Sequence, residues 1–508
     1  MTKISTRVAL TLAVVATLIA GCGGAGSTDS DGPDSAKVAW IIAPNSLDPH
    51  LNRSVPAAEP YISPVYDQLV RLQNTDGMSR MVPMVATDWE YSFDKTALTF
   101  HLRDDVKFHD GTPLTADAVA RSLDRAQNHP NSAVVDRFSS VSAVETPDEH
   151  TVVVRMTAPR SDLLYTLATS AGSIINPRLI DQDLAQLDAG SGPYTLVSVK
   201  PGDRAEYARA EDYWDPDAHA IGKVQIIGMP DDQARLNAAR SGQVDAAMMR
   251  MTQYRDARSL VDSGKFGLAS GNQSSWYGMY LNNSRGPLTN VDVRRAMNFA
   301  VDREGISSAL LNGQCEPTGQ PIQAGATGHV DGADYTYDVA KAKQLLDAAG
   351  YPDGFDLNVV TGGSLTPIAS ALQDQLAAVG IRLSITNLDF SEALAQWQSG
   401  NVDAFAYSHA GTPDPAITLR DVYLTSNYQG QLPQDFQATL ETLLTPVDDE
   451  QRSTLLATAS RRASSDALEV FLCAAPTQYL HIPSLSGFET MTVPFAGGPF
   501  NLRDIRVE

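Results

Sequence analysis

Short apolar runs and longer amphipathic stretches alternate along the chain. The short runs are continuously apolar or alternate apolar with polar positions, as strands do, and they lie at residues 38–42, 98–102, 151–155 and 381–385. The longer stretches are typical of helices and lie at residues 60–72, from Thr115 onward, at 338–349 and at 368–379. Gly350 and Gly380 follow two of them, where glycine commonly ends a helix. This alternation predicts an α/β fold.

One short motif occurs twice. Residues 241–246 read SGQVDA, and residues 399–404, 158 positions later, read SGNVDA. Each copy follows a polar helix, turns at a glycine, and precedes an apolar run, Ala247-Met248-Met249 or Phe405-Ala406-Tyr407. Two helix–glycine–strand units predict two similar lobes with a ligand-binding crevice between them. The alternative is a coincidence in a six-residue match.

The N-terminus has the features of an export signal. Two basic residues precede an apolar run at residues 9–20, which is too short for a comfortable membrane span. The following IAGC resembles the bacterial lipobox, which implies cleavage after a signal peptide of residues 1–21 and a lipid on Cys22. Residues 22–35 then form a flexible tether. We expect an extracytoplasmic protein anchored to the cell membrane by its lipid; an ordinary secretory signal with an incidental cysteine is the alternative.

The composition narrows the possible classes of function. Of the 508 residues, 43% are hydrophobic and 19% are charged, which is ordinary for a packed protein of about three domains. The formal net charge of −22 repels phosphate backbones, so nucleic acid is not an expected partner. No GxxxxGK[ST] or GxGxxG motif occurs in the sequence. We expect no cofactor and no metal site.

Two cysteines remain beyond Cys22, at positions 315 and 473. In an oxidising compartment Cys315 and Cys473 either form a disulfide or stay as two buried free thiols. The sequence does not give their separation in space, so both alternatives stay open.

A long block and several shorter ones carry a family resemblance. Residues 85–125 (VATDWEYSFDKTALTFHLRDDVKFHDGTPLTADAVARSLDR) resemble the signature block of the family 5 solute-binding proteins, which are the dipeptide-, oligopeptide- and nickel-binding components of bacterial ABC importers. Further blocks agree in order: SLDP at 46–49, GSGPY at 190–194, DYW at 212–214, VRRA at 293–296, AVDR at 300–303, the segment 337–351, and DP at 414–415. The resemblance covers about residues 38–485.

The resemblance implies an α/β fold, a two-lobed clamp like the type II periplasmic binding proteins, with an extra domain in the first lobe. We place lobe 1 at residues 36–275 with the extra domain at about 61–189, lobe 2 at 276–484, and a return to lobe 1 at 485–508. The implied function is to capture a peptide or another polar solute in the cleft and deliver it to an ABC permease in the membrane. The family resemblance also implies a monomer that does no chemistry on its ligand.

We expect ligand contacts in loops at strand ends that face the cleft. The candidates are Asn45, Ser46, Trp276, Tyr277, Gly363, Ser364, Tyr407, His409, Gly411, Thr412 and Asp414. Trp276 and Tyr277 either stack on a ligand or pack at a lobe edge. His409 follows a strand of the second lobe and is the most interesting histidine.

The sequence departs from the peptide binders at one position. Many of them place an aspartate three residues before the DP pair, where its carboxylate holds the α-ammonium of the peptide; this chain has Gly411 there, although Asp414 is a possible substitute. Because a desolvated zwitterion needs both counter-charges, a free dipeptide is disfavoured. A longer or capped peptide, an oligosaccharide or another polar metabolite fits better.

Two further functions are alternatives to import. One is a lipoprotein of the same type that binds and regulates an envelope or membrane protein without transport, which a cleft filled by its own side chains would favour. The other is a hydrolase, because Ser92 and Lys95 match SxxK, but they precede a strand and no KTG follows. We therefore expect a binding protein rather than an enzyme. The ligand, its affinity and the permease are not determined by the sequence.

Overall fold

A computed structural model describes residues 34–52, 55–75, 78–218, 221–270, 275–362, 365–409, 411–412, 414–425, 427–490 and 502–507. The expected signal peptide, Cys22, nearly all of the tether, Gly363 and Ser364 lie outside these residues. No helix among the described residues is both long enough and apolar enough to cross a membrane.

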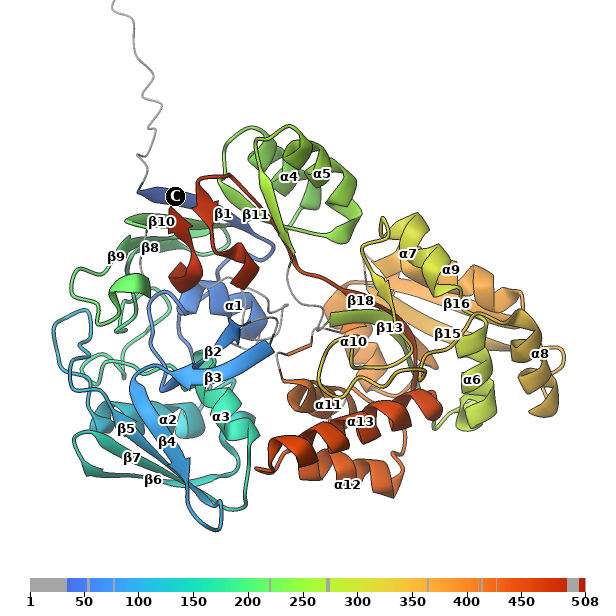
Figure 1. Ribbon diagram of the computed structural model, residues 1–508, viewed down its shortest axis with the longest axis horizontal. Helices are drawn as coiled ribbons and strands as arrows, with labels where there is room; N and C mark the ends of the chain where they lie inside the picture. The colour runs from blue at the N-terminus through green and yellow to red at the C-terminus, as the bar shows by residue number, and fades with distance from the viewer. Residues whose placement is uncertain are drawn as a thin grey trace, which may run out of the picture. The chain divides into compact units, whose positions relative to one another are not determined.

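The first lobe is built on a mixed sheet in the order β12-β19-β11-β1-β10-β9-β8 (Figure 1). Its strands are β1 (Ser35–Trp40), β8 (Tyr194–Lys200), β9 (Arg204–Arg209), β10 (Lys223–Gly228), β11 (Ala246–Met249), β12 (Gly267–Ser270) and β19 (Gln478–His481). Helices α1 (Val55–Ile62), α4 (Asp232–Arg240) and α5 (Tyr254–Asp262) belong to the same lobe. Trp40, Tyr66 and Ile226 are buried in its core.

The expected helix at residues 60–72 is wrong. Helix α1 ends at Ile62, and Val70 already belongs to strand β2 (Val70–Thr75), which pairs with β3 (Met78–Pro83). Pro64 explains the early end, because the residue before a proline is pushed away from helical geometry and proline itself has no N–H to donate.

An extra domain is inserted between α1 and β8. Its antiparallel sheet has the order β4-β5-β7-β6, with β4 (Ala86–Tyr91), β5 (Ala97–Leu102), β6 (Val141–Asp148) and β7 (Thr151–Met156). Helices α2 (Ala116–Asn128) and α3 (Asp162–Leu167) complete it, with Phe100, Phe108 and Leu123 in its core. The domain therefore has a hydrophobic core of its own.

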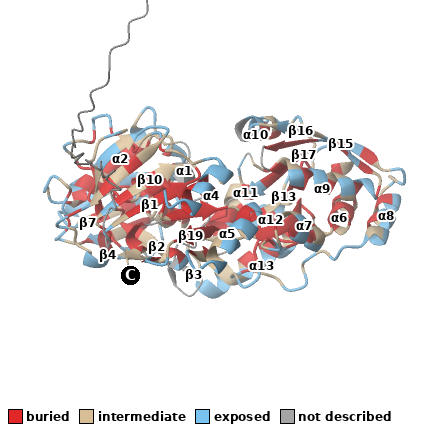
Figure 2. Ribbon diagram, turned by 90° about the horizontal axis from the view of Figure 1, so that it is seen from above, coloured by how far each residue is buried: buried red, intermediate tan, exposed pale blue. Residues whose placement is uncertain are grey.

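The second lobe is built on a sheet in the order β14-β18-β13-β17-β15-β16. Its strands are β13 (Ser275–Leu281), β14 (Glu316–Pro317), β15 (Phe355–Gly362), β16 (Ile381–Leu388), β17 (Ala404–His409) and β18 (Glu469–Ala475). Its helices are α6 (Val291–Phe299), α7 (Arg303–Leu310), α8 (Val339–Ala348), α9 (Thr366–Ala377), α10 (Phe390–Gln398), α11 (Pro415–Tyr423), α12 (Gln434–Leu443) and α13 (Asp449–Ser465). Figure 2 shows the central strands of both sheets largely buried, while much of the outer helical surface is exposed.

The repeated sequence motif marks a structural repeat. Strands β12-β19-β11-β1-β10 and strands β18-β13-β17-β15-β16 show the same succession of two antiparallel and then two parallel pairings. In the first lobe the Asp245 carboxylate accepts from the backbone N–H of Lys37 at 2.8 Å; in the second, Asp403 accepts from the N–H of Asn358 at 2.8 Å. Each motif thus ties a β-strand to its parallel neighbour, as expected for two related α/β units.

The chain passes between the two lobes at a crossing. Strand β12 of the first sheet is followed along the chain by β13 of the second. Strand β18 of the second sheet continues through Pro476 and Thr477 into β19, which pairs with β11 of the first sheet. The return to the first lobe therefore comes before β19, earlier than the boundary expected at residue 484, because β19 pairs within the first sheet. Leu485 and Ile505, which follow β19 in the chain, lie in the core of that lobe.

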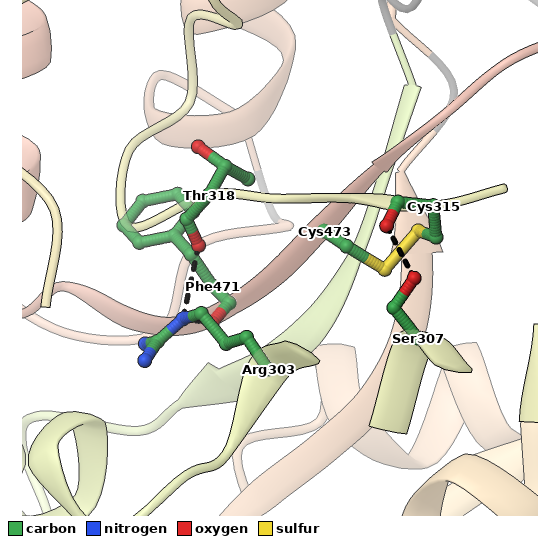
Figure 3. The surroundings of a disulfide bond; sticks show 6 residues. All are labelled: Arg303, Ser307, Cys315, Thr318, Phe471 and Cys473. Atoms are coloured by element: carbon green, nitrogen blue, oxygen red, sulfur yellow. Dashed lines mark hydrogen bonds between the residues drawn. A yellow bond between two sulfur atoms is a disulfide. The ribbon is translucent and has the colours of Figure 1, made fainter. Parts of the chain in front are cut away.

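Cys315 and Cys473 are joined by a disulfide (Figure 3). The bond links the segment before β14 to β18, with 5.4 Å between the Cα atoms. Beside it, Arg303 Nε donates to the carbonyl oxygens of Thr318 and Phe471 at 3.0 and 2.9 Å. Of the two alternatives left open by the sequence, the structure has the disulfide, and it fixes the edge of the second sheet near the crossing.

Candidate ligand-binding site

A cavity of about 1000 Å³ lies where the lobes, the extra domain and the crossing strands meet. Its volume is at the upper end of the range for small-molecule sites. Its lining includes Met248–Met251 after β11, residues of β13, β17, α10 and α11, and the crossing residues Ala475–Thr477. The extra domain contributes Asp136, Arg137, Ser139, Ser140, Arg160 and Asp162. A change in the relative position of the lobes would therefore change the cavity directly.

The second-lobe wall of the cavity is aromatic. Trp276 and Tyr280 on β13 lie beside Phe405 and Tyr407 on β17, while Tyr277 lies on the other face of β13 and reaches the cavity from there. The rings of Tyr280 and Tyr407 are stacked, with 3.6 Å between centroids and 7° between planes. Adjacent antiparallel strands place Trp276, Tyr280, Phe405 and Tyr407 as neighbours on one face, and all four side chains are buried.

A buried carboxylate supports this wall from behind. Glu469 begins β18 and is fully buried; its Oε1 accepts from the Tyr423 hydroxyl at 2.7 Å, and its Oε2 accepts from Trp276 Nε1 at 3.3 Å and from the Tyr407 hydroxyl. Burial raises the pKa of the Glu469 carboxyl from 4.5 to about 7, although these three donors oppose the rise. Glu469 thus holds two wall residues and titrates near neutral pH.

His409 closes one end of the aromatic wall. Its ring lies 4.5 Å from that of Trp276, and its Nδ1 lies 3.4 Å from the Tyr280 hydroxyl. Burial lowers the pKa of the His409 imidazole to about 3. The side chain is therefore a neutral imidazole at any ordinary pH.

A group of charged side chains also lines the cavity. Asp162 of α3 accepts two hydrogen bonds from Arg160, the Nε bond at 2.8 Å, and one from Arg420 Nη1 of α11 at 2.6 Å. Arg420 also pairs with Asp421 at 2.7 Å. Burial alone would raise the pKa of the Asp162 carboxyl, but the hydrogen bonds and charges of the two arginines hold it below its ordinary value. Asp162 and Arg420 therefore form an ion pair between the extra domain and the second lobe.

Further contacts join the extra domain and the second lobe outside the cavity. The Ser161 N–H donates to the Leu444 carbonyl at 2.8 Å, and Lys95 Nζ donates to the Pro446 carbonyl at 2.6 Å. Tyr165 packs with Ile417 and Leu444 in a small apolar cluster. These contacts hold the extra domain against the second lobe in the conformation observed.

The structure brings together some of the residues expected from the sequence. Trp276, Tyr277, Tyr407 and His409 line the cavity. Asn45, Ser46, Gly411, Thr412 and Asp414 lie outside its described lining. Gly363 and Ser364 lie outside the described residues, although their neighbours Gly362 and Leu365 line the cavity.

Local hydrogen bonds explain two of these placements. The Asp414 carboxylate caps α11 through the N–H of Ala416 at 2.9 Å and accepts from Arg452 Nη2, so it is already neutralised. Ser46 Oγ accepts from the N–H of Asp48 at 3.1 Å in a turn of the first lobe. Asp414 is therefore already paired with a cation in this structure.

Sequence reasoning missed the first-lobe and extra-domain parts of the lining. Met248 and Met249 follow the first copy of the repeated motif as Phe405 and Tyr407 follow the second, so the repeat held the signal that could have found them. Arg160 and Asp162 carry no such signal, because their approach to the cavity depends on packing between distant segments. Among the described residues, no group of three His, Cys, Asp or Glu side chains could hold a metal ion.

Comparisons with known proteins agree with this architecture. A sequence model described as "Bacterial extracellular solute-binding proteins, family 5 Middle" matches residues 80–431. The probable D,D-dipeptide-binding periplasmic protein DdpA of Escherichia coli is 30% identical over 378 residues, which are 68% of this chain and 71% of that protein. The glutathione-binding protein GsiB of Pectobacterium atrosepticum is 24% identical over 432 residues, covering 81% and 84% of the two chains.

Solved structures show the same fold. The structure of NikA from Brucella suis in complex with Fe(III)-EDTA has a TM-score of 0.81 at 23% identity and covers 93% of this chain and all of that one. That of AgaA from A. tumefaciens R10, in complex with agropinic acid, has a TM-score of 0.77 at 24% identity and covers 93% and 99%. The two-lobed α/β architecture is therefore shared, while the ligands of these proteins are chemically diverse.

Proposed function

The chain belongs to the bacterial extracellular solute-binding proteins of family 5, and from this premise we propose that it captures a peptide or another polar solute for an ABC importer and delivers it to a membrane permease. The observation that carries the proposal is the cavity of about 1000 Å³ between two repeated lobes, at the strands that cross between them. A cavity of this size also favours transport over the regulatory alternative, for which a cleft filled by its own side chains was expected.

Capture follows from the way the lobes meet around the cavity. The ion pair between Asp162 and Arg420 spans the extra domain and the second lobe, and both residues line the cavity. A ligand that contacts both sides stabilises the closed arrangement only by as much as it prefers that arrangement over an open one. The permease would then receive the closed, loaded form, and the chain itself performs no reaction on the solute.

The ligand class we propose is a longer or capped peptide, an oligosaccharide or another polar metabolite rather than a free dipeptide. Gly411 supplies no carboxylate, and the nearby Asp414 is paired with Arg452. The acids Asp162 and Asp421 of the cavity are paired with arginines. At either of these two carboxylates a free ammonium group would have to displace an arginine. Asp136 and Asp389 also line the cavity, so the proposed ligand class rests on the absent carboxylate at Gly411.

Anchoring to the membrane is a further part of the proposal. The lipobox-like IAGC and the tether of residues 22–35 support a diacylglycerol-modified Cys22, which would keep the clamp beside its permease. We propose a monomer on the outer face of the cell membrane.

Thermal unfolding of residues 36–508 tests the binding function. A ligand at 100 times its dissociation constant adds about 2.7 kcal/mol to the free energy of unfolding, which for a chain of this length corresponds to a rise of about 3 °C in Tm. The panel contains free dipeptides, acetylated and amidated tetrapeptides, oligosaccharides and nickel. We expect Tm to rise with capped peptides or oligosaccharides. A rise confined to free dipeptides would contradict the proposed ligand class. No rise in Tm with any member of the panel would count against the binding function.

A further inference from the structure

One histidine joins the extra domain to the first lobe. His109 lies between β5 and α2 and follows Phe108, a core residue of the extra domain. Its Nδ1 lies 2.6 Å from Asp188 Oδ1, and its Nε2 lies 2.8 Å from the carbonyl oxygen of Gly192. Both partners belong to the segment before β8, where Ala189 is part of the first-lobe core. The imidazole therefore bridges two cores.

The extra domain is connected to the first lobe by an entry segment, residues 63–66, and an exit segment, residues 188–194. The N–H of Gly192 donates to the Val65 carbonyl at 2.8 Å. A Cβ atom on Gly190 would lie 1.8 Å from the Val65 carbonyl oxygen, so that position has no room for a side chain. The two segments are thus packed backbone to backbone, and the histidine contacts the second of them.

Both ring contacts of His109 need a proton on the histidine. A carbonyl oxygen can only accept, so Nε2 is a donor. The Asp188 carboxylate accepts from the backbone N–H of Leu196 at 2.8 Å and from that of Gly190 at 3.2 Å, as an ionised carboxylate does, so Nδ1 is a donor too. His109 is therefore a doubly protonated imidazolium. Loss of its proton would set a nitrogen lone pair against an oxygen in one of the two contacts.

The surroundings of His109 favour the charged form. Burial alone would lower the pKa of the imidazole, but the hydrogen bond and charge of Asp188, with the Gly192 carbonyl and the charge of Asp67, raise it above the ordinary 6.5. The other charged or titratable groups around the pair are Asp67, which pairs with Arg503, Asp110, which pairs with Arg178 at 3.6 Å, and the buried Tyr66. Asp188 is therefore the direct counter-ion of the imidazolium.

We infer that His109 is a proton-dependent lock, which as an imidazolium fastens the extra domain to the exit segment and on losing its proton gives up one of its two contacts. The lock also bears on the cavity, because the extra domain supplies part of the lining opposite Met248–Met251 of the first lobe. The buried ion pair between Arg125 of α2 and Asp48 of the first lobe remains when the lock opens, so the domain loosens without detaching.

NMR of the protein labelled with nitrogen-15 histidine tests the charge state, and the H109Q variant identifies the His109 signals by their loss. We expect both ring nitrogens to be protonated at pH 6, with a titration midpoint above 6.5. The variant D188N should lower that midpoint, because it removes the counter-charge. A neutral imidazole at pH 6, a midpoint at or below 6.5, or a midpoint unaffected by D188N would overturn the inference.

Hydrogen exchange followed by mass spectrometry tests the mechanical role. Because the amide of H109Q cannot donate to both oxygens, the N–H groups of residues 188–196 should exchange about tenfold faster than in wild type at pH 6. That ratio should shrink as the pH rises above the wild-type midpoint, since the wild-type protein then loses the same contact.

A second histidine–aspartate pair provides the matched control. His101 Nδ1 lies 2.6 Å from Asp88 Oδ1 on the exposed surface of the extra domain, so H101Q should leave exchange of residues 188–196 unchanged. Equal exchange of H109Q and wild type at pH 6, or a ratio that does not change with pH, would overturn the lock. Unchanged exchange in α13 of the second lobe shows that the variants are folded.

Discussion

Replacement of Glu469 by glutamine should change how the stability of the protein depends on pH. The carboxyl is fully buried, forms no ion pair with a Lys or Arg of the described residues, and has a pKa raised by burial from 4.5 to about 7. Below pH 4.5 the carboxyl is protonated in the folded and the unfolded chain alike. Between pH 4.5 and 7 the folded chain keeps a proton that the unfolded chain has lost, so the free energy of unfolding falls as pH rises.

The size of this effect follows from the shift itself. A rise of 2.5 pKa units at about 1.4 kcal/mol per unit gives about 3 kcal/mol, all of it lost by the time the pH exceeds 7. Glutamine has no charge to bury and can still accept from Tyr423 or Trp276, so E469Q lacks this loss. The stability of E469Q relative to wild type should therefore increase by about 3 kcal/mol between pH 4.5 and pH 7.5.

Urea unfolding followed by tryptophan fluorescence at four pH values measures that difference. Other titrating groups act equally on both proteins, so they cancel when the two curves are subtracted. Glu450, an exposed carboxyl at the start of α13, provides the matched control E450Q, whose curve should run parallel to that of wild type. An E469Q curve that is also parallel to wild type would refute the reasoning about burial of Glu469.

Three further predictions concern the disulfide, the interlobe ion pair and the anchor. Replacing Cys315 and Cys473 by serine opens a loop of 158 residues and should lower the free energy of unfolding by up to about 5 kcal/mol, visible by calorimetry; a loss below 1 kcal/mol would contradict it. The variant R420M removes the partner of Asp162 in the second lobe, so X-ray scattering should show a larger radius of gyration without ligand. An unchanged radius would argue against a role of this ion pair in holding the extra domain against the second lobe. The variant C22A should move the protein from the membrane to the soluble fraction, whereas persistent membrane attachment would exclude lipidation at this position.

The repeated motif allowed the two-lobed fold to be predicted. The motif encodes the end of a helix, a turn and the start of a strand within a few neighbouring residues. The turn needs glycine, because Gly242 and Gly400 have positive φ values of +75° and +71°. The helix expected at residues 60–72 failed at Pro64, where one residue type decides against a favourable apolar pattern. The position of β19 between β12 and β11 in the first sheet was not predictable, since pairing between segments distant in sequence depends on the whole fold.

The candidate site was predictable on one side only. Trp276, Tyr407 and His409 stand at strand ends of the second lobe and were found from that position. Arg160 and Asp162 reach the cavity because Tyr165 packs on the second lobe, and no local pattern reports such a contact. Glu469 was overlooked as the first residue of an apolar strand, where its three aromatic donors come from distant segments.

Ligand titration of a variant with a blocked cavity tests the central claim most directly. Ser408 is an exposed residue of β17 that lines the cavity, and Ser198 is an exposed residue of β8 outside its described lining, so S408W and S198W form a matched pair. With any solute that raises the Tm of the wild-type protein, calorimetry should show binding weakened by at least about tenfold in S408W and unchanged in S198W. Full affinity in S408W would contradict capture of the solute in the cavity between the lobes.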